Sequence, residues 1–503
     1  MVHPTIHIAT METIWLYAIL FISLVLLIVN REKRKLPPSP VAAFPVIGHL
    51  HLLKPPMHRT LQKLSEKSGP IFSLRFGGRL VVVVSSHAVV EECFTKNDVA
   101  LANRPRTTIG KYIGYNYTVL TGAPYGEHWR NLRRLSTVEI FSSARLNVFQ
   151  SIRHDESKLM LQKLYRKCKS DYARVEVRPI FSDLTLNNIT RMVAGKRLFG
   201  QGEDDEEARQ FQDLIKEIFT YGGISSPADF FPLLRWIDYQ DFQKNLARVS
   251  GKMDAKLQGL IDEQRRNRGS NTMIDHLLGL QESQPEYYTD KIIKGIMMVM
   301  LLAGTDTSSV TIEWAMSALL NHPEKLDKAR AELDHVVGDD RLVNESDLSK
   351  LPYIHNIVSE TMRLFPATPL LVPHESSEDC KIAGYDVPKG TILLVNAWAV
   401  HRDPEIWDDP TSFRPERFED GEVGTPKLIP FGMGRRSCPG SNLALRMVGL
   451  ALGSLIQCFE WQRIGEELVD LSEGKGISMP KAIPLEARCR ARDLLHKLLT
   501  TEA

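Results

Sequence analysis

Apolar residues recur along most of the chain at every third or fourth position, which is the spacing of helices with one buried face. Residues 324–337 show this period directly after Pro323, a residue that suits the first turn of a helix. Residues 443–455 show it as well, and residues 292–302 are apolar on all sides, as in a buried helix. Helix is therefore the dominant predicted structure.

Strands are predicted only in a small part of the chain. Residues 71–74 and 80–84 have the length and composition of strands, and the glycine pair at 77–78 predicts a hairpin turn between them. No internal repeat or low-complexity linker follows Pro45. We expect one folded unit over residues 49–503, mainly α with a small β-sheet region.

The N-terminal part has a different pattern, because residues 14–29 are almost wholly apolar. This run is shorter than the ~20 residues of a full bilayer span, so a secretory signal peptide is the alternative interpretation. A basic stretch without a small-residue cleavage site follows the run, and no Lys or Arg precedes it, which favours an anchor with the body in the cytosol. We predict a transmembrane anchor over residues 11–30, followed over residues 31–48 by a basic stop and a proline-rich hinge. Met11 begins a stretch typical of such anchors, which makes both Met1 and Met11 candidate starts.

The composition excludes some classes of partner and site. Of the 503 residues, 43% are hydrophobic and 25% are charged, which predicts a folded body with a large core. The formal net charge is only +2, so the charge balance does not favour binding to nucleic acid. The 6 cysteines are scattered and form no Cys-x-x-Cys pair, so neither a zinc site nor a disulfide framework is expected, and a reducing compartment fits.

Cys438 has the most informative surroundings in the chain. It ends a glycine-rich loop directly before the apolar run 443–455. Backbone N–H groups and the positive end of a helix dipole would stabilise a thiolate there, and Arg435 and Arg436 add positive charge. Such a thiolate suits the free axial position of a haem iron. The alternatives are a small buried hydrophobe, or a dinucleotide loop in which Ser437 stands where the third glycine is required.

Polar residues interrupt the apolar run 292–302 at its end. Residues 303–309 contain a carboxylate, Asp306, and several hydroxyls, and an unpaired buried carboxylate would be costly. One interpretation is local capping, in which hydroxyls bond back to helix carbonyls and the helix bends at Gly304. The other is proton delivery for O₂ cleavage at a haem, with Asp306 exchanging protons with solvent and Thr307 passing them through ordered water. Gly304 would then leave room for O₂.

Two further predicted helices carry charged residues on one face. Glu360 and Arg363 lie on the same face of a predicted helix and can pair, although this spacing is common by chance. Residues 129–134 form a basic amphipathic helix, which is either a solvated face or a source of cationic partners for the propionates of a haem.

The loop around Cys438 resembles the haem-binding loop of the cytochrome P-450 superfamily. The family pattern Phe-x-x-Gly-x-Arg-x-Cys-x-Gly is matched without departure at Phe431, Gly434, Arg436, Cys438 and Gly440. Residues 303–308 match the oxygen-activation motif of the same superfamily, Ala/Gly-Gly-x-Asp/Glu-Thr-Thr/Ser.

This resemblance implies the haem-thiolate fold with haem b as cofactor and Cys438 as the metal ligand. It implies that electrons come from NADPH through NADPH-cytochrome P-450 reductase. By the same resemblance, Thr307 and Asp306 take the catalytic role in proton delivery, and Ala303 and Gly304 lie beside the cofactor.

The resemblance also assigns the residues that hold the cofactor and its loop. Trp129 and Arg133 would meet one propionate and Arg436 another. His374 stands where many relatives have an arginine, and its charge depends on pH. A buried structural triad would be formed by Glu360, Arg363 and Arg417.

The resemblance extends from the predicted anchor to the C-terminus and is greatest to the plant microsomal A-type group. Residues 228–236, 372–376 and 479–487 are similar to family 81, which oxidises isoflavonoids, lignans, xanthones, triterpenoids, indole compounds and some herbicides. The implied location is the endoplasmic reticulum membrane, with a single pass and a cytosolic catalytic domain. Basic residues that could dock the reductase are Arg130, Arg134 and Arg435.

The resemblance implies hydroxylation of a hydrophobic plant specialised metabolite, but it leaves the substrate open. The expected pocket wall consists of residues 109–120, 219–224, 298–303, 367–372 and Ile483. Oxidative ring coupling or closure of a methylenedioxy bridge would use the same oxidant. Relatives that rearrange peroxides tend to lose the acid–alcohol pair, so its presence disfavours that chemistry. A membrane-bound haem sensor or carrier is the alternative of a different class.

Overall fold

A computed structural model of the chain describes residues 34–168, 171–199, 206–222, 226–231, 234, 238, 241–269, 271–419 and 426–501. The predicted anchor, residues 11–30, and the first residues of the predicted hinge lie outside this part of the chain.

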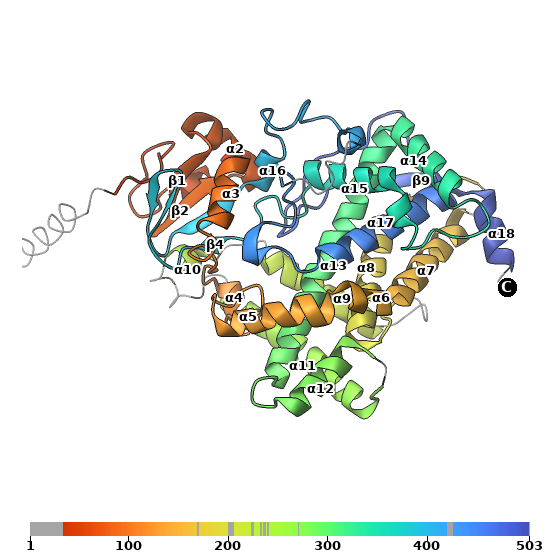
Figure 1. The fold of residues 1–503 in the computed structure, drawn as a ribbon, viewed down its shortest axis with the longest axis horizontal. Helices are drawn as coiled ribbons and strands as arrows, with labels where there is room; N and C mark the ends of the chain where they lie inside the picture. Colours follow the sequence, from red (N-terminus) through yellow and green to blue (C-terminus); the bar gives the residue numbers. More distant parts are fainter. Residues whose placement is uncertain are drawn as a thin grey trace, which may run out of the picture.

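Helices dominate the described residues, which confirms the predicted class (Figure 1). The helices are α2 Met57–Ser68, α3 His87–Thr95, α4 Thr108–Tyr112, α5 Glu127–Arg134, α6 Ser143–Val148, α7 Gln150–Cys168, α8 Arg178–Ala194, α9 Glu206–Gly222, α10 Pro227–Phe230, α11 Phe242–Arg266, α12 Met273–Ser283, α13 Asp290–Asn321, α14 Pro323–Val336, α15 Pro352–Leu364, α16 Ala397–Val400, α17 Ser441–Cys458 and α18 Asp493–Thr501.

The strands form small sheets, as predicted. They are β1 Ile71–Phe76, β2 Arg79–Val84, β3 Ala173–Glu176, β4 His374–Glu375, β5 Cys380–Ile382, β6 Tyr385–Val387, β7 Ile392–Val395, β8 Phe459–Gln462 and β9 Glu486–Ala491. The sheet orders are β1-β2-β7-β4, β3-β9-β8 and β5-β6. The predicted hairpin is the antiparallel pair β1 and β2, and Gly77 in its turn has φ +58°, a conformation that favours glycine.

Local sequence signals explain where several of these elements begin and end. Pro323 is the first residue of α14, where its missing N–H costs nothing. Thr272 and Asp275 cap the start of α12 reciprocally, side chain to backbone N–H in both directions. Gly195 ends α8 in the left-handed conformation with φ +69°.

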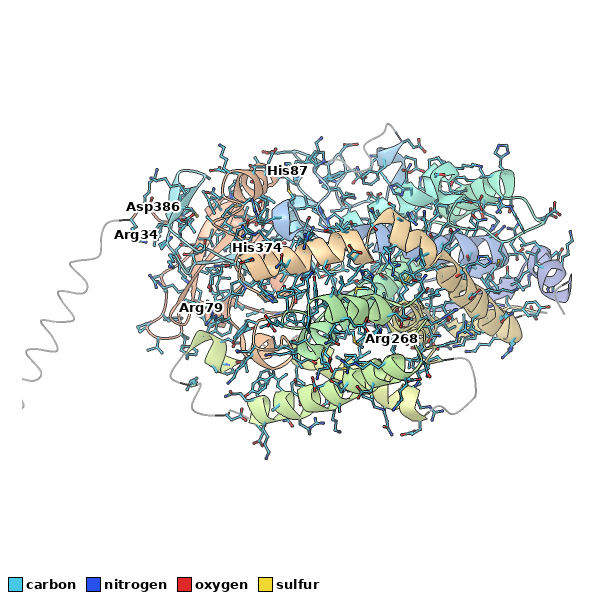
Figure 2. The ribbon with its side chains drawn as sticks, turned by 60° about the horizontal axis from the view of Figure 1, so that its bottom comes forward. Arg34, Arg79, His87, Arg268, His374 and Asp386 are labelled. Carbon is cyan, nitrogen blue, oxygen red and sulfur yellow. The ribbon has the colours of Figure 1, made fainter. Side chains whose placement is uncertain are left out.

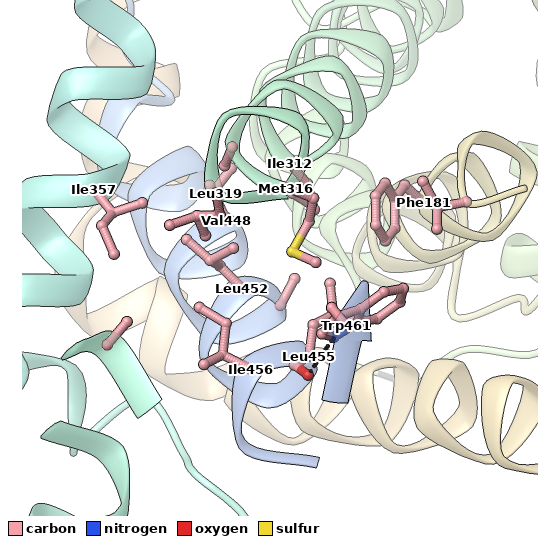
Figure 3. Packing of buried hydrophobic residues seen from close by; sticks show 14 of the residues in the cluster. Phe181, Ile312, Met316, Leu319, Ile357, Val448, Leu452, Leu455, Ile456 and Trp461 are labelled. Atoms are coloured by element: carbon pink, nitrogen blue, oxygen red, sulfur yellow. Dashed lines mark hydrogen bonds between the residues drawn. The ribbon is translucent and has the colours of Figure 1, made fainter. Parts of the chain in front are cut away.

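The largest core lies around α13, which packs against α8, α15 and α17. Met316 of α13, Leu452 of α17 and Phe181 of α8 are all fully buried in it (Figure 3). Trp461 of β8 belongs to the same core and donates its ring N–H to the Leu455 carbonyl at 2.9 Å. α13 and α17 are apolar enough to cross a bilayer by composition, but most of their residues are buried inside this body. They are core helices, and the site described below lies between them.

The described chain enters the body beside the β5-β6 sheet. Arg34 lies 3.2 Å from Asp379, and the Lys35 N–H donates to Asp386 Oδ2 at 2.8 Å. Arg34 and Asp386 lie together at one end of the molecule, whereas His374 lies within it (Figure 2).

Candidate active site

Cys438 lies in a tightly turned loop that leads directly into α17. Its N–H donates to the Phe431 carbonyl at 2.8 Å, which closes the loop on itself. Gly434 has φ +66°, and a Cβ there would lie 2.5 Å from Asp98 Oδ1, so a larger residue does not fit. The loop thereby places the sulfur beside the N-terminal end of α17.

The Cys438 sulfur opens onto an internal cavity of about 290 Å³ that is lined by this loop and by α13. Burial raises the pKa of the Cys438 thiol, while the Gly440 N–H and the charge of Arg133 act in the opposite direction. Because the thiolate is the ligand form, a bound metal would displace the thiol proton.

Most of the residues predicted to surround the cofactor line this one cavity, although they come from distant parts of the chain. They are Trp129, Arg133, Ala303, Gly304, Thr307, His374, Phe431, Arg436, Cys438 and Gly440. Asp306 and Gly434 do not belong to the lining.

The predicted substrate wall is matched in part. Leu120, Met300 and Thr368 line the cavity, each from a segment expected to do so. Phe219 does not line it. Ile483 is also absent from the lining and is 58% exposed, which contradicts the expectation for Ile483. An apolar side chain near the C-terminus could not be assigned to the wall or to the surface from its type alone.

Two arginines that line the cavity, Arg436 and Arg133, donate to backbone carbonyls. Arg436 donates to backbone carbonyls, including Ala102 at 2.7 Å and Ala123 at 2.6 Å. Arg133 donates to the Ser437 carbonyl. Among the described residues, neither arginine forms an ion pair with Asp or Glu.

Arg104 joins this group and was not predicted. It donates to the Val372 and Pro373 carbonyls at 2.7 and 2.8 Å, and its buried Nε has no hydrogen-bond partner in the described part of the chain. Burial and Arg436 lower the pKa of Arg104 to about 9. Burial and Arg133 lower the pKa of Arg436 to about 10. The arginines lower one another's pKa, and Arg104 Nε has an unused hydrogen to donate, so this group of residues favours an anionic ligand. The two propionates of a haem held by the cysteine thiolate would supply both the negative charge and the acceptor atoms.

His374 is buried beside these arginines, and its ring lies tilted against that of Phe94, with the ring centroids 4.8 Å apart. Burial, together with Arg104 and Arg436, holds the pKa of His374 well below its usual value, so the ring is neutral. Its Nδ1 lies 2.7 Å from the Leu101 carbonyl and must donate there, which leaves Nε2 as an acceptor. Donation from His374 to a propionate would require the ring to gain a proton.

The acid–alcohol stretch continues α13 without a break. The Thr307 hydroxyl donates to the Ala303 carbonyl at 2.7 Å, the local bond expected from the capping interpretation, while the side chain also lines the cavity. Gly304 has a packing role in addition to any role beside O₂, because a Cβ there would lie 2.8 Å from Ile189 of α8.

Asp306 lies outside the cavity lining and accepts a hydrogen bond from Ser478. Burial raises the pKa of Asp306, and the Ser478 hydroxyl and the charge of Arg178 act in the opposite direction. Ser478 was not predicted, because a serine about 170 residues away in sequence carries no pattern that links it to Asp306. The loop that carries Ser478 is fixed by two backbone contacts: Met479 N–H donates to the Ala367 carbonyl, and Trp314 donates to the Met479 carbonyl, both at 2.8 Å.

Glu473 fastens the start of the same loop to α2 and α16. Its side chain is 2% exposed and contacts His58 at 2.8 Å and Arg59 at 2.7 Å. Trp398 also donates to it at 3.1 Å. Burial alone would raise the pKa of Glu473, but the hydrogen bonds from His58 and Arg59 outweigh it and lower the pKa to about 2.

Replacing Glu473 with glutamine should therefore reduce stability near neutral pH by about 2–3 kcal/mol. A depressed carboxyl pKa contributes stability that is fully present above the unfolded value of ~4.3 and is lost as the pH falls towards 2. The stability of the parent should consequently drop faster than that of Glu473→Gln between these pH values. Denaturant unfolding across this range measures both slopes, and parallel slopes would contradict the assignment.

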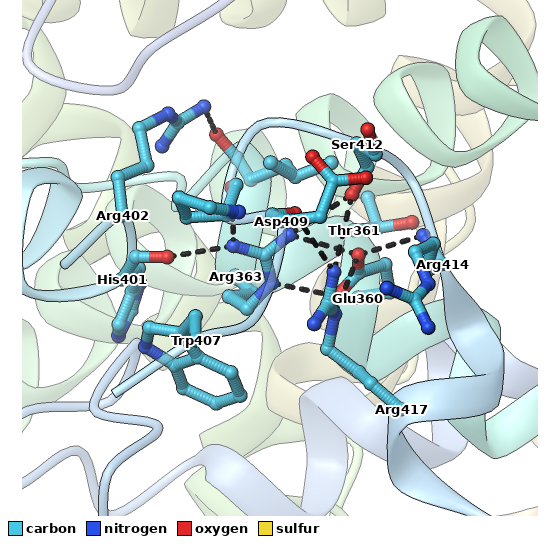
Figure 4. Close-up of polar contacts among 12 residues, drawn as sticks. Glu360, Thr361, Arg363, His401, Arg402, Trp407, Asp409, Ser412, Arg414 and Arg417 are labelled. Atoms are coloured by element: carbon cyan, nitrogen blue, oxygen red, sulfur yellow. Dashed lines mark hydrogen bonds and ion pairs between the residues drawn. The ribbon is translucent and has the colours of Figure 1, made fainter. Parts of the chain in front are cut away.

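Glu360, Arg363 and Arg417 form a buried ion-pair cluster (Figure 4). Arg363 contacts Glu360 through two nitrogens at 2.7 and 2.8 Å, and both side chains are 0% exposed. Arg417 lies 3.0 Å from Glu360, and the Arg414 N–H donates to the same carboxylate at 2.8 Å.

The cluster connects to the residues that precede the cysteine loop. Arg363 donates to the His401 carbonyl at 2.7 Å. Burial and the charge of Arg363 lower the pKa of His401 to about 3, so its neutral Nε2 accepts the Ile429 N–H at 2.9 Å. His401 was not predicted, and it supplies the physical path by which the charged cluster reaches the start of the Pro430–Cys438 loop.

The basic residues considered for reductase docking differ in availability. Arg435 is engaged inside the molecule, 2.8 Å from Asp98 and 2.6 Å from the Tyr125 hydroxyl. Arg130 and Arg134 of α5 are exposed.

Known proteins are similar to this chain in sequence over most of its length. The family model of cytochrome P-450 matches residues 37–484. Cytochrome P-450 81Q32 of Catharanthus roseus is 62% identical over 482 residues, which are 96% of this chain and 97% of the relative. (+)-Piperitol/(+)-sesamin synthase of Sesamum radiatum is 56% identical over 97% of this chain and 99% of its own length. Isoflavone 2'-hydroxylase of Glycyrrhiza echinata is 52% identical over 96% and 97%, respectively. The chain therefore belongs to the cytochrome P-450 family, within its plant family 81, and is a monooxygenase that uses haem b and electrons delivered from NADPH by a reductase.

Proposed function

We propose that this enzyme hydroxylates a hydrophobic plant specialised metabolite, either a phenolic of isoflavonoid, lignan or xanthone type or a triterpenoid. The observation that carries this proposal is that Cys438 and Thr307 line the same internal cavity from two different elements. Side chains such as Ile296, Val299 and Leu371 make much of the remaining wall apolar, so a flat hydrophobic molecule would bind with little loss of polar solvation. Relatives that are named for acting on isoflavones or as a sesamin synthase support the phenolic class.

Different residues of the chain would have different roles in this reaction. Cys438 would hold the iron through its thiolate, and Arg104, Arg133 and Arg436 would hold the propionates through charge-assisted hydrogen bonds. When bound, haem supplies the activation of O₂ and the insertion of one oxygen atom. The apolar wall excludes water and orients the substrate. Thr307 would position a water at the cavity, and Asp306 would exchange protons behind it, with Ser478 holding the carboxyl in place.

Replacing Thr307 with alanine should keep the haem and the substrate site but lower product per NADPH by about tenfold or more. The Thr307 hydroxyl belongs to a cavity-lining residue that directly follows Asp306 in α13, so its loss would leave proton delivery unguided. Hydrogen peroxide released per NADPH should rise in step. Thr305→Ala is the matched control, because this hydroxyl also donates to a carbonyl of α13, that of Leu301 at 2.7 Å, but Thr305 does not line the cavity. An unchanged peroxide yield in Thr307→Ala would remove Thr307 from the relay.

Labelled O₂ tests the reaction and the substrate together. The full-length enzyme is combined with a plant reductase, NADPH, ¹⁸O₂ and a panel of isoflavones, lignans, xanthones and triterpenoids that first give a substrate-induced spectral shift. Hydroxylation leaves one ¹⁸O in the product. Ring coupling or methylenedioxy closure leaves no label and a product two hydrogens lighter, and the sesamin synthase relative makes this the second candidate. No NADPH-dependent product from any class would overturn the proposal.

The proposed location is the endoplasmic reticulum membrane, with a single N-terminal pass and the catalytic domain in the cytosol. The apolar run at residues 14–29 and the basic stretch after it support this orientation. Exposed Arg130 and Arg134 support docking of an acidic reductase near α5, which also carries Arg133 of the cavity.

A further inference from the structure

Cys168 and Cys489 lie in contact although they are 321 positions apart in the chain. Their sulfur atoms are 3.1 Å apart, about 1 Å more than a disulfide bond. Their side chains are 1% and 0% exposed, and both belong to the large core around α13. Neither lines the haem cavity, so the function of the active site does not explain the pair.

The fold holds both sulfurs in place from rigid elements. Cys489 lies in β9, the central strand of its sheet, opposite Ala173 of β3 and Trp461 of β8. Alternation along β9 turns Cys489 inward together with Ala487, and α7 packs against this strand. Cys168 is the last residue of α7. The pair therefore joins a helix end to the middle of a sheet.

The two thiols are not equivalent. The Cys489 S–H donates to the Cys168 sulfur, and the Cys168 S–H points to the Leu164 carbonyl at 3.0 Å. This hydrogen bond from Cys489 lowers the pKa of Cys168 against the effect of burial, and Lys167 acts in the same direction. The same contact and burial raise the pKa of Cys489. Cys168 is thus the better nucleophile, and Cys489 is placed to attack it second.

We propose that Cys168 and Cys489 form a disulfide when the enzyme meets hydrogen peroxide. The Cys168 thiolate attacks one peroxide oxygen, the O–O bond breaks, and the leaving hydroxide takes up a proton to become water. The resulting sulfenic acid is attacked by the Cys489 sulfur, the S–O bond breaks, and a second water leaves. In sum, two thiols and one peroxide give one disulfide and two waters, with two electrons passing from sulfur to peroxide.

Peroxide is the oxidant that this class of enzyme meets most directly, because turnover that fails to insert oxygen releases it. Hydrogen peroxide is small and uncharged, so a local opening of the fold would admit it to the buried pair. A buried disulfide would in turn be shielded from the glutathione pool.

Cys458 provides a control inside the same core. It is also 0% exposed, but burial raises its pKa to about 12, and among the described residues no hydrogen bond joins it to another cysteine. Cys458 therefore matches Cys168 and Cys489 in burial and in its place in the core, and it differs from them in lacking a bond to a second cysteine among the described residues.

Peptide mass spectrometry of the full-length, haem-loaded enzyme tests the proposal. The enzyme is treated with hydrogen peroxide, quenched with catalase, unfolded in an alkylating reagent and digested without reduction. We expect a peptide pair joined through Cys168 and Cys489, two hydrogens lighter than the separate peptides, and full alkylation at Cys458. Alkylation of Cys168 and Cys489 as complete as that of Cys458 would overturn the proposal.

Single variants test the direction of the reaction. In Cys489→Ser, a 1,3-diketone that traps sulfenic acids should label Cys168 after peroxide, since the second attack cannot occur. In Cys168→Ser, Cys489 should stay unlabelled. Label on Cys489 but not on Cys168 would overturn the assignment of the attacking sulfur, and the unsubstituted enzyme keeps the disulfide itself testable if either variant fails to fold.

Discussion

Replacing Cys438 with serine is expected to abolish the thiolate-type CO difference spectrum and all NADPH-dependent product. A serine hydroxyl at this position stays protonated near neutral pH and is a poor ligand for iron, whereas the thiolate donates electron density that favours O–O cleavage. The loop itself should persist, because its closing bond uses the backbone N–H of residue 438 rather than the side chain. The measurements are the reduced CO spectrum, haem content and product formation.

Cys380→Ser is the matched control for that experiment. Cys380 lies in β5, is partly exposed and does not line the cavity, so its replacement should leave the spectrum and the activity unchanged. A thiolate-type spectrum that survives in Cys438→Ser would show that another residue holds the iron.

Replacing Glu360 with glutamine is expected to lower stability by about 3–5 kcal/mol, the cost of leaving a buried charge uncompensated. Arg363 is 0% exposed, and glutamine would remove the carboxylate that it contacts through two nitrogens. Loss of the cluster should also loosen Ile429 through His401 and so reduce haem retention. Thermal unfolding at a fixed scan rate, followed by far-ultraviolet dichroism and by the haem band, measures both effects.

Glu419→Gln supplies the exposed comparison. Glu419 pairs with Lys328 at 2.7 Å, but the two side chains are 48% and 47% exposed, so the loss should be below about 1 kcal/mol. Equal stability of the two variants would mean that the Glu360 cluster does not support the loop.

Features set by neighbouring residues were predictable from the sequence. The start of α14 follows from Pro323, and the β1-β2 hairpin follows from a glycine pair between two apolar runs. The class of fold and the family follow from the residues around Cys438 and from residues 303–308, which match family patterns over consecutive positions.

Features set by tertiary contacts were not predictable. Arg104, His401 and Ser478 acquire their relevance from partners far away in the chain, and no spacing or composition distinguishes them from surface residues. The sequence predicted that glycine at position 304 leaves room for O₂. The close approach of Ile189 is a second reason for glycine there, and it depends on how α8 packs against α13.

The arginines that converge on the cavity also bear on how this protein is made. Before porphyrin arrives, the charge of Arg436 is repelled by the charges of Arg104 and Arg133, which favours a loosened nascent chain. Because the folded chain binds porphyrin and the unfolded chain does not, capture of porphyrin should drive the last stage of folding. The amount of mature enzyme in a cell should accordingly follow porphyrin supply, with the surplus polypeptide removed by quality-control proteases.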